Sequence, residues 1–284
     1  MQKRAIGKKP TRPLRSDSGS ACRGVTECRT AEPARATRHA DEAMLDDGTS
    51  VSQLGYEYSS AMLDQLRGQV ALPARLDTAV LRRQVDFLAG RLCAQRALRT
   101  AGFEGDVEIA TGEHGAPIWP ADFLGSISHC DGLAIASIAR ARRIAALGID
   151  VERQMSAEVA SDIRRQLATD RELAMGRQGS MSPEAWLTVL FSGKESLYKA
   201  LYPDVGRYFD FLDATAVHLD ASTGTFTLGL RVSLSPDHPQ GSTYPIRFRW
   251  NADRVFTRCV VPASARPDAQ RSRPQGESQA DGGH

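Results

Sequence analysis

The segment Phe191-Ser192-Gly193-Lys194-Glu195-Ser196-Leu197-Tyr198-Lys199-Ala200-Leu201 holds the only two lysines outside the N-terminal tail. Lysine is a compact, mobile point charge, whereas arginine presents a rigid planar fork. Lys194 and Lys199 flank Glu195, which predicts ammonium groups that reach phosphate beside a metal-binding carboxylate. The alternative is an amphipathic helix with an i,i+4 pair between Glu195 and Lys199, worth about 0.2–0.5 kcal/mol.

Two more carboxylates lie upstream, in Gly148-Ile149-Asp150-Val151-Glu152. Side chains two apart on a strand share a face, so Asp150 and Glu152 are expected on its open face and Ile149 and Val151 toward the core. Two hard oxygen ligands suit Mg²⁺, which takes one or two carboxylates plus phosphate oxygens. A solvated strand end is the alternative.

A third polar cluster is Ser126-Ile127-Ser128-His129. Its hydroxyls and imidazole could bind phosphate, or could form a hydrophilic turn. No G-x-S-x-G elbow accompanies the serines, which argues against a serine hydrolase.

Around these clusters the apolar spacing predicts helices and paired strands. Helices are expected over 76–99, 156–176 and 183–201, the last with Ser182 as N-cap and Pro183 in its first turn. Strands are expected over 107–110, 124–129, 133–139 and 145–152, and near 216–219, 225–233, 246–250 and 255–261. Asp131-Gly132 marks a tight turn. Strands clustered in hairpins indicate an α+β fold.

The composition divides the chain into four parts. Residues 1–50 are rich in arginine and poor in large apolar residues, which predicts a disordered basic tail. This tail could be a transit peptide, or an extension upstream of a true start at Met44. Residues 51–150 and 151–262 form two α+β halves, and 263–284 form a second disordered tail.

Composition also excludes several function classes. A formal net charge of +2 gives no support for a nucleic-acid binder. The five cysteines form no C-x-x-C pair, which argues against a disulfide framework or a zinc site and favours a cytoplasmic setting. No apolar run approaches the roughly 20 residues of a membrane span.

Taken in order, S-x-S-H, G-I-D-V-E and F-S-x-K-E-S-x-x-K-A resemble the 4′-phosphopantetheinyl transferases. The chain is most similar to their larger, pseudodimeric class, of the enterobactin-synthase component D type. Supporting stretches extend the resemblance over 72–214: Arg83-Gln84, Phe87-Leu88-Ala89-Gly90-Arg91, Trp119-Pro120 and Ala200-Leu201-Tyr202-Pro203.

The resemblance implies two similar α+β halves with the active site in the cleft between them. It also implies magnesium-dependent transfer of 4′-phosphopantetheine from coenzyme A to a serine of an apo carrier protein, releasing adenosine 3′,5′-bisphosphate. The partners would be acyl, peptidyl or aryl carriers of nonribosomal peptide, polyketide, siderophore (such as enterobactin) or fatty-acid synthesis. A pseudodimer can act as a monomer.

Site roles follow from the same resemblance. It implies magnesium ligands at Asp150, Glu152 and Glu195, with Glu195 also the candidate base. It implies coenzyme contacts at Arg83, Arg91, Ser128, His129, Lys194 and Lys199, with Ser128 and His129 at the 3′-phosphate. One departure is the stretch His114-Gly115-Ala116-Pro117, where the family usually has a basic residue. Either His114 replaces that residue or a phosphate contact is missing.

Two other functions remain open from the sequence. A magnesium-dependent nuclease or phosphohydrolase also uses paired acids and a lysine, but typically places the lysine where this chain has Gln154. A non-catalytic carrier-binding module is the other alternative, and the intact acids and lysines argue against it.

Overall fold

The computed structural model describes residues 48–112 and 115–263. Met44, His114 and nearly all of both expected tails lie outside these ranges. The first strand, β1 (Thr49–Gly55), begins inside the segment expected to be a tail.

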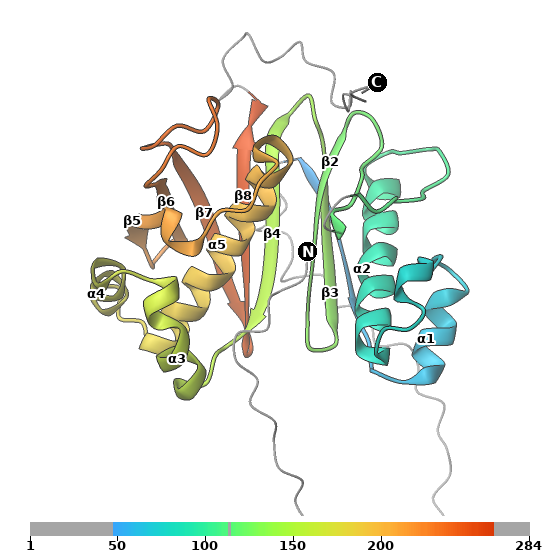
Figure 1. Cartoon of the computed structure of the whole chain (residues 1–284), viewed down its shortest axis with the longest axis horizontal. Helices are drawn as coiled ribbons and strands as arrows, with labels where there is room; N and C mark the ends of the chain where they lie inside the picture. The colour runs from blue at the N-terminus through green and yellow to red at the C-terminus, as the bar shows by residue number, and fades with distance from the viewer. Residues whose placement is uncertain (1–47, 113–114, 264–284) are drawn as a thin grey trace, which may run out of the picture.

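The first half is a three-stranded antiparallel sheet with two helices on one face (Figure 1). The strand order is β1-β3-β2, with β3 at Leu133–Arg140 and β2 at Phe123–Cys130. The helices are α1 (Ser60–Arg67) and α2 (Leu81–Thr100). α2 packs on the sheet through apolar residues that include Leu88, Leu92 and Leu98.

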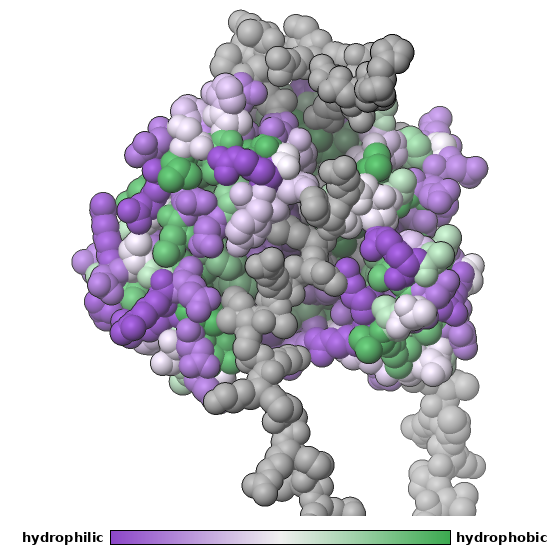
Figure 2. Space-filling model, viewed as in Figure 1, coloured by the Kyte–Doolittle hydropathy of each residue, from purple (hydrophilic) through white to green (hydrophobic). Residues whose placement is uncertain are grey.

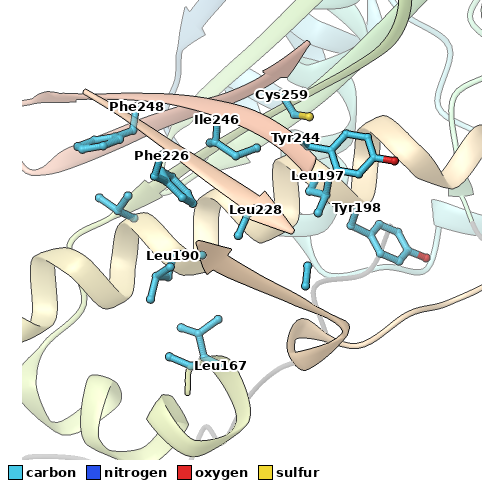
Figure 3. Close-up of a cluster of buried hydrophobic side chains, with 14 of the residues drawn as sticks. Leu167, Leu190, Leu197, Tyr198, Phe226, Leu228, Tyr244, Ile246, Phe248 and Cys259 are labelled. Carbon is cyan, nitrogen blue, oxygen red and sulfur yellow. The ribbon is translucent and has the colours of Figure 1, made fainter. Parts of the chain in front are cut away.

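The second half is a five-stranded antiparallel sheet in the order β4-β8-β7-β6-β5. Its strands are β4 (Ile144–Arg153), β5 (Ala214–Asp220), β6 (Thr225–Leu230), β7 (Thr243–Asn251) and β8 (Arg254–Pro262). Its helices are α3 (Ala157–Leu167), α4 (Asp170–Gln178) and α5 (Pro183–Val205). Figure 3 shows the apolar core between α5 and strands β6 to β8, with Leu190, Phe226 and Ile246 among its members.

The two halves repeat one plan, an antiparallel sheet with a long helix across it; in Figure 1, α5 crosses one sheet and α2 covers the other, with β4, β2 and β3 between these helices. A third apolar cluster lies between the sheets and includes Ile135, Ile149 and Val151. The predicted α+β class is therefore confirmed. Hydrophilic side chains spread over both flanks of the face shown in Figure 2.

Several elements differ from the sequence prediction. The expected helix over 156–176 is two helices, because Thr169 accepts from Glu172 N and caps α4. The expected strand at 107–110 is absent; only an isolated bridge joins Thr111 to Pro117. The expected boundary between residues 150 and 151 falls within β4, whose ladder partner is β8. No described helix is long and apolar enough to span a membrane.

Candidate active site

Three of the predicted site residues, Ser128, Asp150 and Lys199, meet where β2, β4 and α5 come together. Helix α5 begins as predicted, with Ser182 Oγ accepting from Ala185 N at 3.2 Å and Pro183 in the first turn. It crosses β4 so closely that a Cβ added at Gly148 would lie 1.8 Å from Ser196 O. The glycine therefore sets how near the side chains of α5 come to Asp150.

Asp150 is buried rather than on an open strand face, with 1% of its surface exposed. Its Oδ1 accepts from Ser128 Oγ at 2.7 Å and from Lys199 Nζ at 2.7 Å. Its Oδ2 accepts from Ser192 Oγ at 3.0 Å. The expectation of exposure was wrong because it treated β4 as an isolated strand, whereas α5 covers this face.

Ser126 and Ser128 join β2 to β4 through their side chains. Ser126 Oγ accepts from Ile149 N at 3.0 Å, and Ser128 Oγ accepts from Val151 N at 3.3 Å. The hydroxyls thus satisfy two backbone donors on the edge of β4, where no backbone ladder to β2 exists. Ser128 is 2% exposed, so its hydroxyl holds Asp150 and β4 instead of facing a ligand. The expected 3′-phosphate contact at Ser128 is corrected accordingly.

Lys199 lies over the same strand. Its ammonium donates to Ile149 O at 3.1 Å as well as to Asp150. The side chain is 14% exposed, so the ion pair stands at the edge of the interior. A charge-assisted contact of this kind is short and strong, and it neutralises the buried carboxylate.

Lys194 points to a different part of the protein. Its ammonium pairs with Glu172 Oε1 at 2.9 Å and donates to Leu167 O at 2.7 Å. Both side chains are almost fully buried, and burial lowers the pKa of Lys194 while Glu172 opposes that shift. Glu172 also accepts from Ala216 N. Lys194 therefore ties α5 to α4 and β5, and its expected contact with phosphate is corrected.

The other two expected metal ligands, Glu152 and Glu195, are half-buried. Glu195 lies one turn before Lys199 on α5, and the Cys130 thiol contacts Glu152 Oε2 at 3.8 Å. Across 48–112 and 115–263, no three His, Cys, Asp or Glu side chains are grouped as a metal site. The donor chemistry nevertheless fits Mg²⁺, because these are hard carboxylate oxygens on two elements in contact.

The expected phosphate contacts of the first half lie on α2 and at the end of β2. Arg83 and Arg91 are eight residues apart, which places them near one face of α2. Arg91 is 4% exposed; its guanidinium donates to Thr111 Oγ1 and lies over the Phe87 ring. Burial lowers the pKa of Arg91 to about 10, and repulsion from Arg75 adds to the shift. Arg91 Nε has no hydrogen-bond partner among the described residues, and a buried guanidinium in this state suits an anionic ligand.

The hydrogen bonds among three hydroxyls at the site, those of Ser192, Ser196 and Thr257, were not predicted from the sequence. Ser192 Oγ lies 2.8 Å from Thr257 Oγ1, and Ser196 Oγ lies 2.7 Å from the same oxygen. Thr257 stands opposite Asp150 in the β4–β8 register. Only the β4–β8 register reveals this network, because Thr257 is 65 residues from Ser192 in the sequence.

Family models divide the chain as the sheets do. The model for the 4′-phosphopantetheinyl transferase N-terminal domain matches residues 72–139, and the model for the 4′-phosphopantetheinyl transferase superfamily matches residues 146–255. The first match ends in β3 and the second begins in β4. The chain belongs to the 4′-phosphopantetheinyl transferase superfamily. The resemblance found in the sequence motifs is confirmed.

Curated relatives of this superfamily member include three named transferases or synthase components. It is 36% identical to the 4′-phosphopantetheinyl transferase Svp of Streptomyces mobaraensis over 56% of this chain and 64% of the relative. It is 31% identical to the 4′-phosphopantetheinyl transferase Npt of Nocardia iowensis over 65% and 82%. It is 37% identical to enterobactin synthase component D of Salmonella typhi over 44% and 51%. The chain thus spans less than two thirds of the first and third of these relatives.

Proposed function

We propose that the protein transfers 4′-phosphopantetheine from coenzyme A to a serine of an apo carrier protein, with Mg²⁺, and releases adenosine 3′,5′-bisphosphate. The observation that carries the proposal is the Asp150–Lys199 pair at the β2–β4–α5 junction, with Glu152 and Glu195 beside it. The superfamily and the names of the relatives support the same chemistry.

The reaction joins the carrier serine oxygen to the β-phosphorus of the diphosphate. The bond from that phosphorus to the bridging oxygen breaks, and the leaving group keeps the bridging oxygen. Glu195 is the group proposed to accept the serine proton, as a general base within reach of the attacking hydroxyl. Lys199 is proposed to place its positive charge on the diphosphate.

Asp150, Glu152 and Glu195 are the residues proposed to hold the magnesium ion. The bound ion would supply charge neutralisation at the diphosphate and the leaving group. Arg83, Arg91 and His129 are proposed to hold the phosphates of the coenzyme. Ser128 and Lys194 are no longer in this group; they fix the positions of Asp150 and α5.

The carrier partner is proposed to belong to nonribosomal peptide, polyketide, siderophore or fatty-acid synthesis. Similarity to enterobactin synthase component D supports the siderophore choice. A monomer in the cytoplasm is also proposed. The monomer follows from both halves lying on one chain, and the buried thiols of Cys93 and Cys259 suit a reducing compartment.

The test incubates purified protein with Mg²⁺, coenzyme A and an apo carrier protein, and reads the intact mass of the carrier. A gain of one phosphopantetheine, abolished by chelation, supports the proposal. Glu152→Gln should lose the gain, whereas Glu158→Gln, at an exposed residue of α3, should keep it. Cleavage of plasmid DNA without carrier modification would instead favour the nuclease, and binding of carrier without either reaction would favour the non-catalytic module.

A further inference from the structure

Asp86 is a buried carboxylate of α2 to which the proposed reaction gives no role. Its side chain is 9% exposed. Oδ1 accepts from Tyr56 Oη at 2.5 Å and from Tyr58 Oη at 3.0 Å. Burial first, and then Asp86, raise the pKa of both tyrosines, so that they stay protonated and keep donating.

The second oxygen of Asp86 faces an imidazole and a guanidinium. His129 Nδ1 lies 3.7 Å from Oδ2, and Arg82 Nε lies 4.0 Å from it. Arg82 is also paired with Asp131, in the turn that follows β2. With the phenols on Oδ1, the carboxylate is fixed in rotation and its other oxygen is directed at the imidazole side.

Tyr56 and Tyr58 also hydrogen-bond to the backbone of the turn that follows His129. Tyr56 N donates to Gly132 O at 2.8 Å, and Gly132 N donates to Tyr58 Oη at 3.2 Å. Gly132 has φ 82°, and a Cβ there would lie 2.7 Å from Tyr56 O, so this position requires glycine. Tyr56 and Tyr58 thus position both the backbone of the turn and the carboxylate that meets His129.

We propose that Asp86 is a positioning residue that orients the His129 imidazole toward a phosphate of the coenzyme. A carboxylate that faces Nδ1 sets the orientation and the tautomer of the ring. The inference rests on the proposed function, in which His129 meets the 3′-phosphate. It adds three residues, Tyr56, Tyr58 and Asp86, that no motif of the sequence analysis included.

The test compares the Kd values of coenzyme A and 3′-dephospho-coenzyme A by calorimetry. The Kd of 3′-dephospho-coenzyme A divided by the Kd of coenzyme A isolates the contribution of the 3′-phosphate, because the two ligands share every other group. Asp86→Asn keeps the size and one acceptor oxygen but removes the charge, and should lower the ratio about tenfold. Asp77→Asn makes the same charge change at a 59% exposed carboxylate and should leave the ratio unchanged.

Two further variants separate positioning from a general structural effect. Tyr58→Phe removes one donor to Asp86 and should lower the ratio in the same direction; it carries the test if Asp86→Asn does not fold. In a His129→Ala background, Asp86→Asn should have no further effect on the ratio. A ratio unchanged in folded Asp86→Asn, or an Asp86→Asn effect that persists without His129, would overturn the inference. Failure of the proposed function is distinct, because the wild type would then bind neither ligand.

Discussion

Lys194 and Lys199 illustrate what a residue type can and cannot predict. The scarcity of lysine drew attention to both, and Lys199 does lie against Asp150. However, positions five apart on a helix differ by about 140° around its axis. The two ammonium groups therefore face different sides of α5, and only Lys199 is on the side of β4. The five-residue spacing therefore already indicated that the two lysines do not share a face of the helix.

For Lys199, the conservative replacement Lys199→Arg should lower turnover about tenfold, or about 1.4 kcal/mol of transition-state stabilisation. A planar guanidinium cannot fit the space in which the ammonium meets both Ile149 O and Asp150. Initial rates against coenzyme A concentration measure the effect, with thermal melting as the folding control. Equal rates would contradict a role at the phosphates.

Asp150 and Glu152, two residues apart, should differ in what they do for stability. Asp150→Ala leaves a partly buried ammonium and two buried hydroxyls without this acceptor, so the free energy of unfolding should fall by about 3 kcal/mol. Glu152→Ala, at a half-buried strand end, should cost about 1 kcal/mol or less. Urea denaturation of both variants checks this. Losses of similar size would mean that the hydrogen bonds of Asp150 add little.

Helices and strands with clear start or turn signals were predictable from the sequence. The Asp-Gly turn fixed the β2–β3 hairpin, and Ser182-Pro183 fixed the start of α5. Thr169 and Glu172 form a capping box whose T-x-x-E signature was present in the sequence but was read as helix interior. β1 was missed because its apolar residues do not alternate, and α1 because its eight residues give too short a helical pattern. Both are stabilised by packing, β1 on β3 and α1 on α2.

The contact of α5 with β4 provides a test of one packing distance. Gly148→Ala should destabilise the protein by about 1–3 kcal/mol or more and lower activity, because the new methyl group meets the α5 backbone. Gly55→Ala is the matched control, since nothing lies within 4 Å of its added Cβ. Urea midpoints and transfer rates of both variants decide the matter; a tolerated Gly148→Ala would show that α5 can shift without cost.

The assembly of the two halves was the least predictable feature. Asp150 and Lys199 are 49 residues apart, and Ser128 and Asp150 are 22 apart. Motif order identified the participants, but neither burial nor partner choice follows from order alone. The hydroxyl contacts between β2 and β4 depend on how two sheets pack, which local sequence does not encode.

Truncation should show which N-terminal residues the fold requires. A chain starting at Met44 keeps β1 and should retain stability and activity. A chain starting at Tyr56 loses β1, including Thr49, whose Oγ1 accepts from the buried Arg258 Nη2 at 2.7 Å. That chain should lose cooperative unfolding, because Arg258 and the edge of β3 lose their partners. Circular dichroism melts and carrier modification test both; loss of function in the Met44 chain would show that the upstream residues are needed.

Alkaline pH should lower the free energy of unfolding. Burial raises the pKa of Cys93 and Cys259 from 9.0 to about 12. The thiols ionise at a lower pH in the unfolded chain than in the folded protein. The free energy of unfolding is therefore unaffected below about pH 9 and falls as the pH rises toward 12, by about 1.4 kcal/mol per pH unit for each thiol. Urea denaturation between pH 8 and 10.5 measures the decline. Cys259→Ala should make it shallower, and an unchanged slope would contradict the assignment.

The burial of both lysines has a practical consequence for conjugation chemistry. Within the described ranges, Lys194 and Lys199 are the only primary amines, and their side chains are 2% and 14% exposed. Amine-reactive dyes and crosslinkers should therefore react slowly with this part of the chain. A lysine introduced at an exposed position such as Glu158 would then take up an ester reagent ahead of Lys194 and Lys199, without modifying Asp150 or its partners.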